Sequence, residues 1–381
     1  MTATASRLEV AHGADGGFDV TARRADRYRI HLENGLTDRL ADHLRELVAA
    51  LDAHRIVLTM DTVVAAHHLS SVSAVLARVG VPFDVVLVAE GEATKSQSGL
   101  QGLWRSLQRV KATRRTLVLG VGGGMVCDLT TAAAATYMRG VPYALVPTTL
   151  LAQVDAAIGG KGGINYDGTK NLVGAFQHPA AVFVDPELIR TLPDQHIRNG
   201  LAEVVKVALI ADPGLFAVLE RSVGRGAATW PWDAIIRAAI TAKLLLLAPD
   251  PFEQADLRRL LNLGHCVGHP YEAAAGFRVL HGEAVAAGLA VATALSLHGG
   301  HCTRGDHDRI LAVLSGHRLP TTVPAPLRAD VWDALEAVRR VRNGHLHLVV
   351  PAAPGHCTVV DEVTREAFDR ALRHLDRRCR P

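Results

Sequence analysis

The feature that most limits the fold of this chain is an alternation of short apolar runs with helix-patterned segments through its first 185 residues. The apolar runs are "RIVLTMD", "FDVVLVAEGE", "TLVLGVGGG" and "YALVPTTLL". Between them, segments such as "QGLWRSLQRV" carry apolar residues at helical spacing. Strands that alternate with helices in this way indicate a parallel sheet covered by helices on both faces.

After about Asp185 the strand signal fades and long helical patterns follow, including one over 255–274. We therefore predict an α/β fold in which an N-terminal doubly wound parallel-sheet domain, 1–184, precedes a mostly α-helical domain, 185–381. The first twenty or so residues, rich in Gly, Ala and Thr, are predicted to be a loose lead-in. Near the end, "GHLHLVVP" and "HCTVVDEV" are either small strands or covering loops.

The charge of the chain argues against nucleic acid as a partner. Its 41 basic and 38 acidic residues are interspersed and give a formal net charge of +3, whereas nucleic-acid binding normally needs a basic stripe. No run reaches the length of a membrane span and the start lacks a signal-peptide pattern, so we expect a cytoplasmic protein without a membrane partner. The five cysteines form no CxxC pair and are expected to be reduced.

A glycine-rich turn, "LVLGVGGGMVCDL", joins a predicted strand to a predicted helix. Glycines at such a turn let backbone N–H groups approach a pyrophosphate at the helix N-terminus. Cys127 stands where a third spaced glycine would be, and a tight turn without a ligand explains the pattern nearly as well. Asp61 ends an early strand, as a ribose-binding acid does, although it could simply cap the next helix.

Two further segments carry charged residues of interest. "GGKGGINYDGTKN" places Lys161 and Lys170 in a predicted glycine-rich loop, where they either bind phosphate oxygens or face solvent. In "GLAEVVKVALI", Glu203 and Lys206 lie three residues apart on an apolar helical face, and a buried ion pair is the simpler interpretation.

The stretch "LNLGHCVGHPYEAAAGFRVLHGE" contains His265, His269 and His281. His265 and His269 are four residues apart and share one helical face, as metal ligands on helices often do. With Glu203 and His281, this pair would supply enough ligands for a catalytic zinc-type site that keeps a position open. A core histidine with satisfied hydrogen bonds is the alternative for either member of the pair.

These segments, in this order, resemble the sugar phosphate cyclase superfamily, most closely 3-dehydroquinate synthase. The resemblance covers roughly 61–289 and rests on "GGGMVCDL", "ATYMRG", "PTTLLAQVDAAIGGKGGIN", "TKNLVGAF", "GLAEVVKVALI", "LLNLGHCVGH" and "LHGEAV". It implies an NAD-binding α/β domain, a helical metal-binding domain and a homodimer. It also implies a phosphate-eliminating lyase that closes a phosphorylated heptulose into a ring through transient oxidation by NAD, phosphate elimination, re-reduction and an intramolecular aldol step.

The resemblance also implies roles for individual residues. The ligands of a divalent metal, Zn or Co, would be Glu203, His265 and His281. NAD would be bound by Asp61, Glu92, Lys95, Gly123, Gly124, Asp128, Thr148, Thr149, Asp155 and Lys170. The substrate and catalytic residues would be Lys161, Lys206, Lys243, Arg258, Asn262, His269, Asn171 and Arg139, the last reaching across the dimer.

Several positions depart from the family pattern. Cys127 replaces a usual glycine, Cys266 replaces a usual threonine, and Asp256 stands where glycine is expected in a segment one residue longer than usual. The late "DKK" signature is "VRR" here, at 338–340, and arginine binds phosphate with different geometry from lysine.

The leading hypothesis for the reaction is conversion of 3-deoxy-arabino-heptulosonate 7-phosphate to 3-dehydroquinate. Lys243 and Arg258 would bind the substrate carboxylate, and relatives that use neutral sugars tend to replace the residues that stand here as Asn262 and His269. The alternative is a specialised paralogue, either an aminodehydroquinate synthase or a valiolone-type cyclase that acts on sedoheptulose 7-phosphate. A metal-dependent alcohol dehydrogenase ranks lower, because it explains the two-lysine segment poorly.

Overall fold

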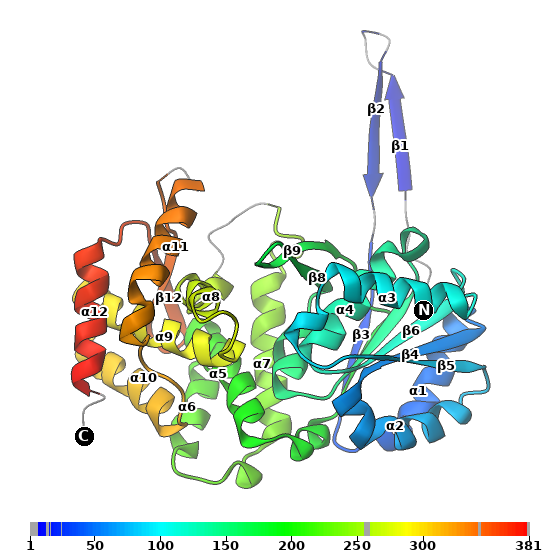
Figure 1. Cartoon of the computed structure of the whole chain (residues 1–381), viewed down its shortest axis with the longest axis horizontal. Coiled ribbons are helices and arrows are strands. Elements are labelled where there is room, and N and C mark those ends of the chain that lie inside the picture. Colours follow the sequence, from blue (N-terminus) through cyan, green and yellow to red (C-terminus); the bar gives the residue numbers. More distant parts are fainter. Residues whose placement is uncertain are drawn as a thin grey trace. The chain divides into compact units, whose positions relative to one another are not determined.

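The computed structural model describes residues 7–12, 15, 17–23, 25–254, 260–341 and 344–378 (Figure 1). By its contacts the chain divides into two compact units. The first comprises 1–31, 35–146 and 160–184, and the second comprises 32–34, 147–159 and 185–381. The division into sequence domains 1–184 and 185–381 stays a prediction. None of the helices described is long and apolar enough to cross a membrane.

A six-stranded sheet in the order β3-β10-β7-β6-β4-β5 forms the centre of the first unit. Its strands are β3 (Arg29–Leu32), β4 (Arg55–Asp61), β5 (Phe83–Val88), β6 (Thr116–Gly122), β7 (Tyr143–Pro147) and β10 (Ala181–Val184). Strand β4 pairs in parallel with β5 on one side and β6 on the other, and β10 pairs in parallel with β7. Strands β4 and β6 are buried almost throughout, as expected for a parallel sheet covered on both faces.

Four helices cover this sheet, with α1 and α2 on one face and α3 and α4 on the other (Figure 1). They are α1 (Leu36–Ala50), α2 (Thr62–Ala77), α3 (Gln97–Arg109) and α4 (Gly124–Thr136). In α1 the buried residues Leu36, Leu40, Leu44 and Leu47 recur at helical spacing and form its core-facing stripe. The predicted doubly wound α/β class is confirmed.

Two hairpins replace segments that we predicted to be irregular. The lead-in prediction is wrong because β1 (Arg7–His12) and β2 (Phe18–Arg23) pair antiparallel in register. The predicted glycine loop is instead a hairpin of β8 (Lys161–Tyr166) and β9 (Thr169–Phe176). Its turn has positive φ at Asp167 (47°) and Gly168 (73°), the backbone that a two-residue hairpin favours, and Asp-Gly is its usual sequence.

Glycine serves close packing in this second hairpin. A Cβ placed on Gly162 would lie 2.4 Å from Thr131 Cγ2, on helix α4. The missing side chain therefore lets β8 lie directly on α4, which is a physical reason for glycine in a strand that faces a helix.

The second unit is mostly helical, as predicted. Its helices are α5 (Asp194–Ala211), α6 (Pro213–Ser222), α7 (Trp232–Leu247), α8 (His265–Ala274), α9 (His281–His298), α10 (Arg304–Gly316), α11 (Arg328–Val341) and α12 (Arg365–Arg378). Helix α9 is buried along most of its length and contacts α5, α8, α10 and α12. Strands β11 (Leu348–Ala353) and β12 (His356–Val360) pair antiparallel, so the late segments are small strands.

The prediction of one continuous helix over 255–274 is wrong for residues 260–274, which are the part of this segment that the structure describes. Helix α8 begins only at His265, because Gly264 has φ 78° and breaks the helical path. The remaining short helices are η1 (Glu92–Thr94), η2 (Tyr137–Arg139), η3 (Ala152–Ala156), η4 (Pro186–Thr191), η5 (Ala227–Thr229), η6 (Leu260–Asn262) and η7 (Ala325–Leu327).

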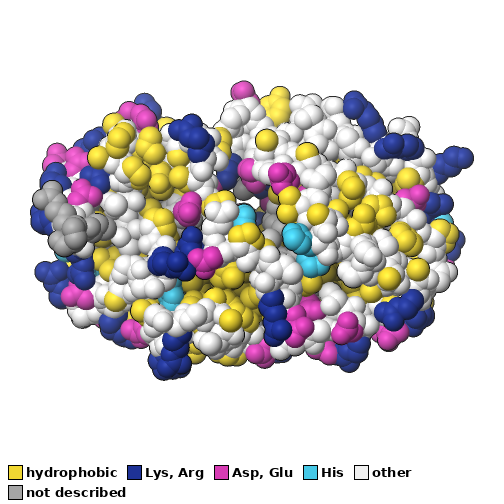
Figure 2. Space-filling model, turned by 60° about the horizontal axis from the view of Figure 1, so that its bottom comes forward, with side chains coloured by type: hydrophobic (Ala, Val, Ile, Leu, Met, Phe, Trp, Pro, Cys, Tyr) yellow, Lys and Arg dark blue, Asp and Glu magenta, His cyan; other side chains and the backbone are white. Residues whose placement is uncertain are grey.

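Basic and acidic side chains are interspersed on the face shown in Figure 2. No disulfide joins the described cysteines, which are Cys127, Cys266, Cys302 and Cys357.

Candidate active site

The second unit brings together the three predicted metal ligands. Glu203 lies on α5, His265 begins α8 and His281 begins α9. The Nε2 atoms of His265 and His281 lie 3.5 and 3.3 Å from Glu203 Oε1. One ligand atom from each residue lies within 4.8 Å of the other two. Glu203, which precedes both histidines by more than sixty positions in the sequence, therefore forms one compact cluster with them.

The close approach of α5 and α9 creates this cluster. A Cβ on Gly282 would lie 1.9 Å from Asn199 O, so only glycine fits between the two helices. The Gly282 N–H donates to Asn199 Oδ1 over 2.6 Å, which ties the start of α9 to α5 one turn before Glu203. The backbone contact of Gly282 with α5 therefore places the neighbouring residue, His281, beside Glu203.

The environment of Glu203 suits a cation. Its side chain is 2% exposed, and neither carboxylate oxygen receives a hydrogen bond of good geometry from the described residues. Burial alone would raise the pKa of this carboxyl, but Lys206 and the two histidines lower it well below its usual range. Lys206 forms an ion pair with Glu203 Oε2, so the predicted buried pair is present beside the histidines.

The two histidines differ in protonation. Burial, aided by Lys206, lowers the pKa of His265 to about 3, so His265 is neutral at pH 7. Burial would also lower the pKa of His281, but its contacts with Glu203 and Glu272 raise it to about 9. His281 Nδ1 lies 3.2 Å from Glu272 Oε2.

Our sequence interpretation missed Glu272, although it follows His269 by three residues, about one helical turn.

Other predicted residues belong to the same unit as this cluster. The His269 ring centroid lies 4.9 Å from that of His265, and Asn262 is half-buried on η6. Lys243 Nζ on α7 donates to Asp155 Oδ1 over 2.6 Å and to Asp155 O over 2.5 Å. Thr148 is buried, and Thr149 Oγ1 accepts a bond from Ala152 N. Arg258 lies outside the described residues.

In the first unit, Asp61 and the glycine turn lie at the same edge of the sheet. They lie at the carboxyl ends of the adjacent parallel strands β4 and β6, between which the strand order reverses, and this is where open α/β sheets bind ligands. Helix α4 starts after Gly123 with no side-chain cap on its first amides. Asp61 Oδ1 accepts from Val64 N over 2.8 Å, so the predicted capping alternative is present. A role of Asp61 toward ribose stays a prediction.

A polar network joins four other predicted residues of this unit. Lys95 is 4% exposed, and its ammonium contacts the Asp128 carboxylate and Asn171 Oδ1. The side chain of Asn165 connects Glu92 to Asn171. Its Nδ2 donates to Glu92 Oε1 over 2.9 Å, and its Oδ1 accepts from Asn171 N over 3.0 Å. Asn165 was missed in the sequence because its position opposite these residues depends on the β8–β9 register.

Lys161, Lys170 and Arg139 are the remaining predicted residues of the first unit. Lys161 is exposed, with Nζ 5.9 Å from the ring centroid of its strand partner Phe176. Lys170 is half-buried on β9. Arg139 is exposed on η2 and has φ 65°.

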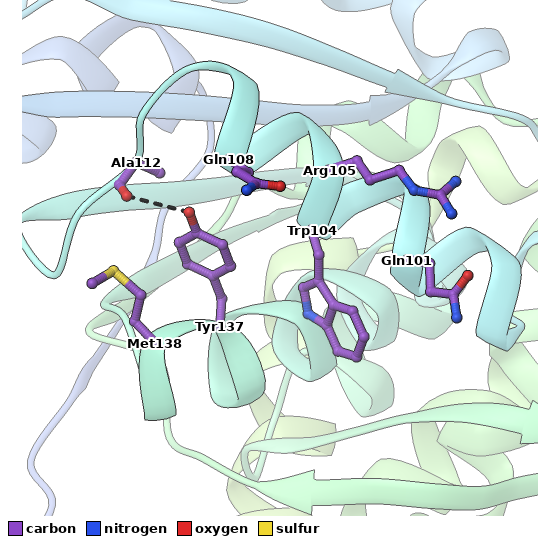
Figure 3. A pocket seen from close by; sticks show the side chains of 7 residues that line it. All are labelled: Gln101, Trp104, Arg105, Gln108, Ala112, Tyr137 and Met138. Atoms are coloured by element: carbon purple, nitrogen blue, oxygen red, sulfur yellow. Dashed lines mark hydrogen bonds between the residues drawn. The ribbon is translucent and has the colours of Figure 1, made fainter.

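A surface pocket of about 420 Å³ lies between α3 and η2 (Figure 3). It is lined by Gln101, Trp104, Arg105, Gln108, Ala112, Tyr137 and Met138. Tyr137 donates its hydroxyl hydrogen to Ala112 O over 3.3 Å. None of the predicted site residues lines this pocket.

Comparisons with known proteins agree with this arrangement. Two family models, 3-dehydroquinate synthase N-terminal and C-terminal, match residues 85–199 and 200–341. A 2-epi-valiolone synthase of Stigmatella aurantiaca is 46% identical over 372 residues, covering 94% of this chain and 91% of the relative. A 3-dehydroquinate synthase of Symbiobacterium thermophilum is 38% identical, covering 92% of this chain and 99% of the relative.

The fold of this chain also matches a solved structure of a sugar phosphate cyclase. That structure is ValA, the 2-epi-5-epi-valiolone synthase from Streptomyces hygroscopicus subsp. jinggangensis 5008 with NAD⁺ and Zn²⁺ bound, and it matches with a TM-score of 0.85 and 31% identity. The match covers 94% of this chain and 99% of ValA. The protein is therefore a sugar phosphate cyclase. Within that class the chain belongs to the 3-dehydroquinate synthase family, which confirms the resemblance in its sequence.

Proposed function

We propose that this chain is a valiolone-type cyclase that closes sedoheptulose 7-phosphate into a 2-epi-valiolone-type cyclitol and releases phosphate. The observation that carries the proposal is the 46% identity to a 2-epi-valiolone synthase over 94% of the chain. This identity supports the valiolone-type cyclase, which was the alternative hypothesis from the sequence, better than it supports a 3-dehydroquinate synthase.

The surroundings of Lys243 agree with a substrate that has no carboxylate. Lys243 is one of the two residues predicted to bind a substrate carboxylate, and it is 7% exposed. Its ammonium is bonded to the Asp155 carboxylate, which offsets the charge. A substrate carboxylate would have to compete with this buried pair, whereas a hydroxyl can share it without adding charge.

We infer that the chain uses NAD and a divalent metal, Zn or Co. The buried oxygens of Glu203, with His265 and His281, are a donor set that these metals accept. The first amides of α4, which have no side-chain cap, suit a pyrophosphate, with Asp61 at the same sheet edge. When bound, NAD supplies reversible oxidation and the metal supplies Lewis acidity.

The chain itself would supply positioning and charge. We assign phosphate binding to Lys161, Asn171 and His269, with Arg139 acting across a homodimer, and NAD binding to the Glu92, Lys95 and Asp128 network together with Thr148, Thr149 and Lys170. Burial would lower the pKa of Lys206, but Glu203 and Asp155 raise it above its usual value, so Nζ keeps its proton. A fixed ammonium here can stabilise negative charge that develops on substrate oxygens.

The test compares two sugar phosphates with the purified full chain, NAD and Zn²⁺ or Co²⁺. We expect sedoheptulose 7-phosphate to release inorganic phosphate and give a cyclitol of the matching mass, with no net NADH. Phosphate release from 3-deoxy-arabino-heptulosonate 7-phosphate alone would contradict the proposal. Net NADH formation from an alcohol, without phosphate release, would favour the dehydrogenase hypothesis.

The dehydroquinate reaction remains the second candidate, because Asn262 and His269 are both retained. The same assay decides between them, since the two substrates differ in the carboxylate and the two products differ in mass.

A further inference from the structure

Glu272 is a buried carboxylate next to the predicted metal cluster. It lies on α8, is 0% exposed, and its Oε2 is 3.2 Å from His281 Nδ1. A carboxylate is rarely buried so completely unless a partner satisfies it. His281 is such a partner, and its other ring nitrogen, Nε2, lies on the side of Glu203.

This contact determines which nitrogen of His281 can bind a metal. In the neutral imidazole, which is the form that binds a metal, an Nδ1–H that donates to a carboxylate leaves Nε2 with its lone pair directed away from that carboxylate. Here Nε2 is directed to Glu203 Oε1, 3.3 Å away. A carboxylate behind a ligating imidazole also holds the ring in one orientation and increases its basicity.

The other histidine of the cluster is oriented in a different way. His265 Nδ1 lies 3.1 Å from the backbone carbonyl of Leu263, so no side chain is needed to orient its ring. Of these two histidines, only His281 has its outer nitrogen on a carboxylate. A substitution at position 272 therefore acts on one ligand and leaves the other's hydrogen bond unchanged.

We propose that Glu272 is a positioning residue that orients His281 and presents its Nε2 to a divalent metal. This inference rests on the proposed function, because it takes Glu203, His265 and His281 as the ligands. Glu272 does not itself touch the metal in this arrangement.

The first experiment measures Zn²⁺ affinity of the full-length chain by competition with a chromophoric chelator. Glu272→Gln keeps the size of the side chain and an acceptor oxygen but removes the charge. We expect one Zn²⁺ per chain with affinity about 10- to 100-fold weaker than wild type, as is typical when such an outer partner is lost. Equal affinity in the variant and wild type would overturn the proposal.

Glu283→Gln is the matched control. Glu283 Oε2 accepts from Leu280 N over 3.0 Å at the start of the same helix as His281, and thus caps the helix without holding the imidazole. We expect a lower melting temperature for this variant but unchanged Zn²⁺ affinity. An equal loss of affinity in both variants would mean that helix stability alone explains the effect, which would contradict the proposal.

A second measurement uses wild type and does not depend on a folded variant. Imidazole nitrogen NMR of the Zn²⁺-loaded chain should show His281 with Nδ1 protonated and Nε2 bound to metal. Metal on Nδ1 would overturn the proposal. So would two Zn²⁺ per chain, because His269, Glu272 and His281 also have ligand atoms within 4.8 Å of one another and would then bind the second ion. If wild type binds no metal, the ligand assignment in the proposed function fails instead.

Discussion

The charge states of the side chains in the candidate metal site depend on their burial and on the charges next to them. Glu203 and Lys206 are each 2% exposed and are stabilised by one another, and neither would be tolerated alone in such an environment. The same pair lies beside His265, whose lowered pKa keeps the imidazole neutral and ready to bind a metal. One buried carboxylate therefore serves both an ion pair and a candidate metal site.

His265→Ala tests the ligand assignment. We expect bound metal to fall to background, and kcat/KM to fall by about 10²-fold or more because Lewis acidity is worth several kcal/mol. Metal content by atomic absorption and phosphate release are the two readouts. His67→Ala, which removes an exposed histidine on α2, is the control and should retain its metal. Full metal content in His265→Ala would refute the assignment.

At the scale of elements, the β8–β9 hairpin carries several predicted substrate and cofactor residues on its two strands, which a two-residue turn connects. Lys161, Lys170 and Asn171 all lie on its strands, and Asn171 contacts Lys95. The geometry of the turn therefore affects the position of these side chains.

Gly168→Ala tests this dependence. Gly168 has φ 73°, which costs an alanine roughly 1 kcal/mol. We expect a lower melting temperature and a several-fold higher KM for the sugar phosphate, with kcat less affected. Gly226→Ala is the control, because Gly226 lacks a positive φ and no atom lies within 4 Å of the added Cβ. An unchanged KM in Gly168→Ala would show that the hairpin does not position these residues.

For the whole molecule, a second histidine cluster should affect stability in acid. His298 on α9, His307 on α10 and His374 on α12 pack together, with ring centroids of His374 5.2 and 4.9 Å from the other two. Burial and the two neighbouring histidines lower the pKa of His374 to about 4, and burial also lowers those of His298 and His307. The charged groups acting on the cluster are Arg304, Arg370, Arg377, Arg378 and Asp308.

The sign of the pH effect follows from these shifts. The unfolded chain, with an ordinary histidine pKa of 6.5, binds more protons than the folded chain between about pH 6.5 and 4. Stability is therefore lost as the pH falls through this window. We expect the melting temperature of metal-free wild type to fall more steeply over this range than that of His374→Phe. Parallel curves would show that the cluster does not contribute.

The sequence predicted the sheet strands β4, β6 and β7 well, because buried parallel strands are continuous apolar runs that need no tertiary information. It also predicted the edge strand β5, whose run is apolar although only partly buried. It did not predict the β1–β2 and β8–β9 hairpins, where Gly and Thr suggested loops. In the second case "YDGT" was a local turn signal, since Asp-Gly favours such a turn. The break at Gly264 was also missed, because a glycine within a helical pattern does not reveal its φ.

The residues of the candidate site could be named from the sequence through family resemblance, and Glu203, His265 and His281 do lie together. What the sequence by itself determined was local: strand and helix periodicity, the glycine turn and the residue types available for chemistry. Only the tertiary structure decided which of these meet, because Glu272 on His281, Asp155 on Lys243 and Asn165 beside Asn171 depend on helix packing and strand register. Contacts between distant residues are set by packing, which local periodicity does not encode.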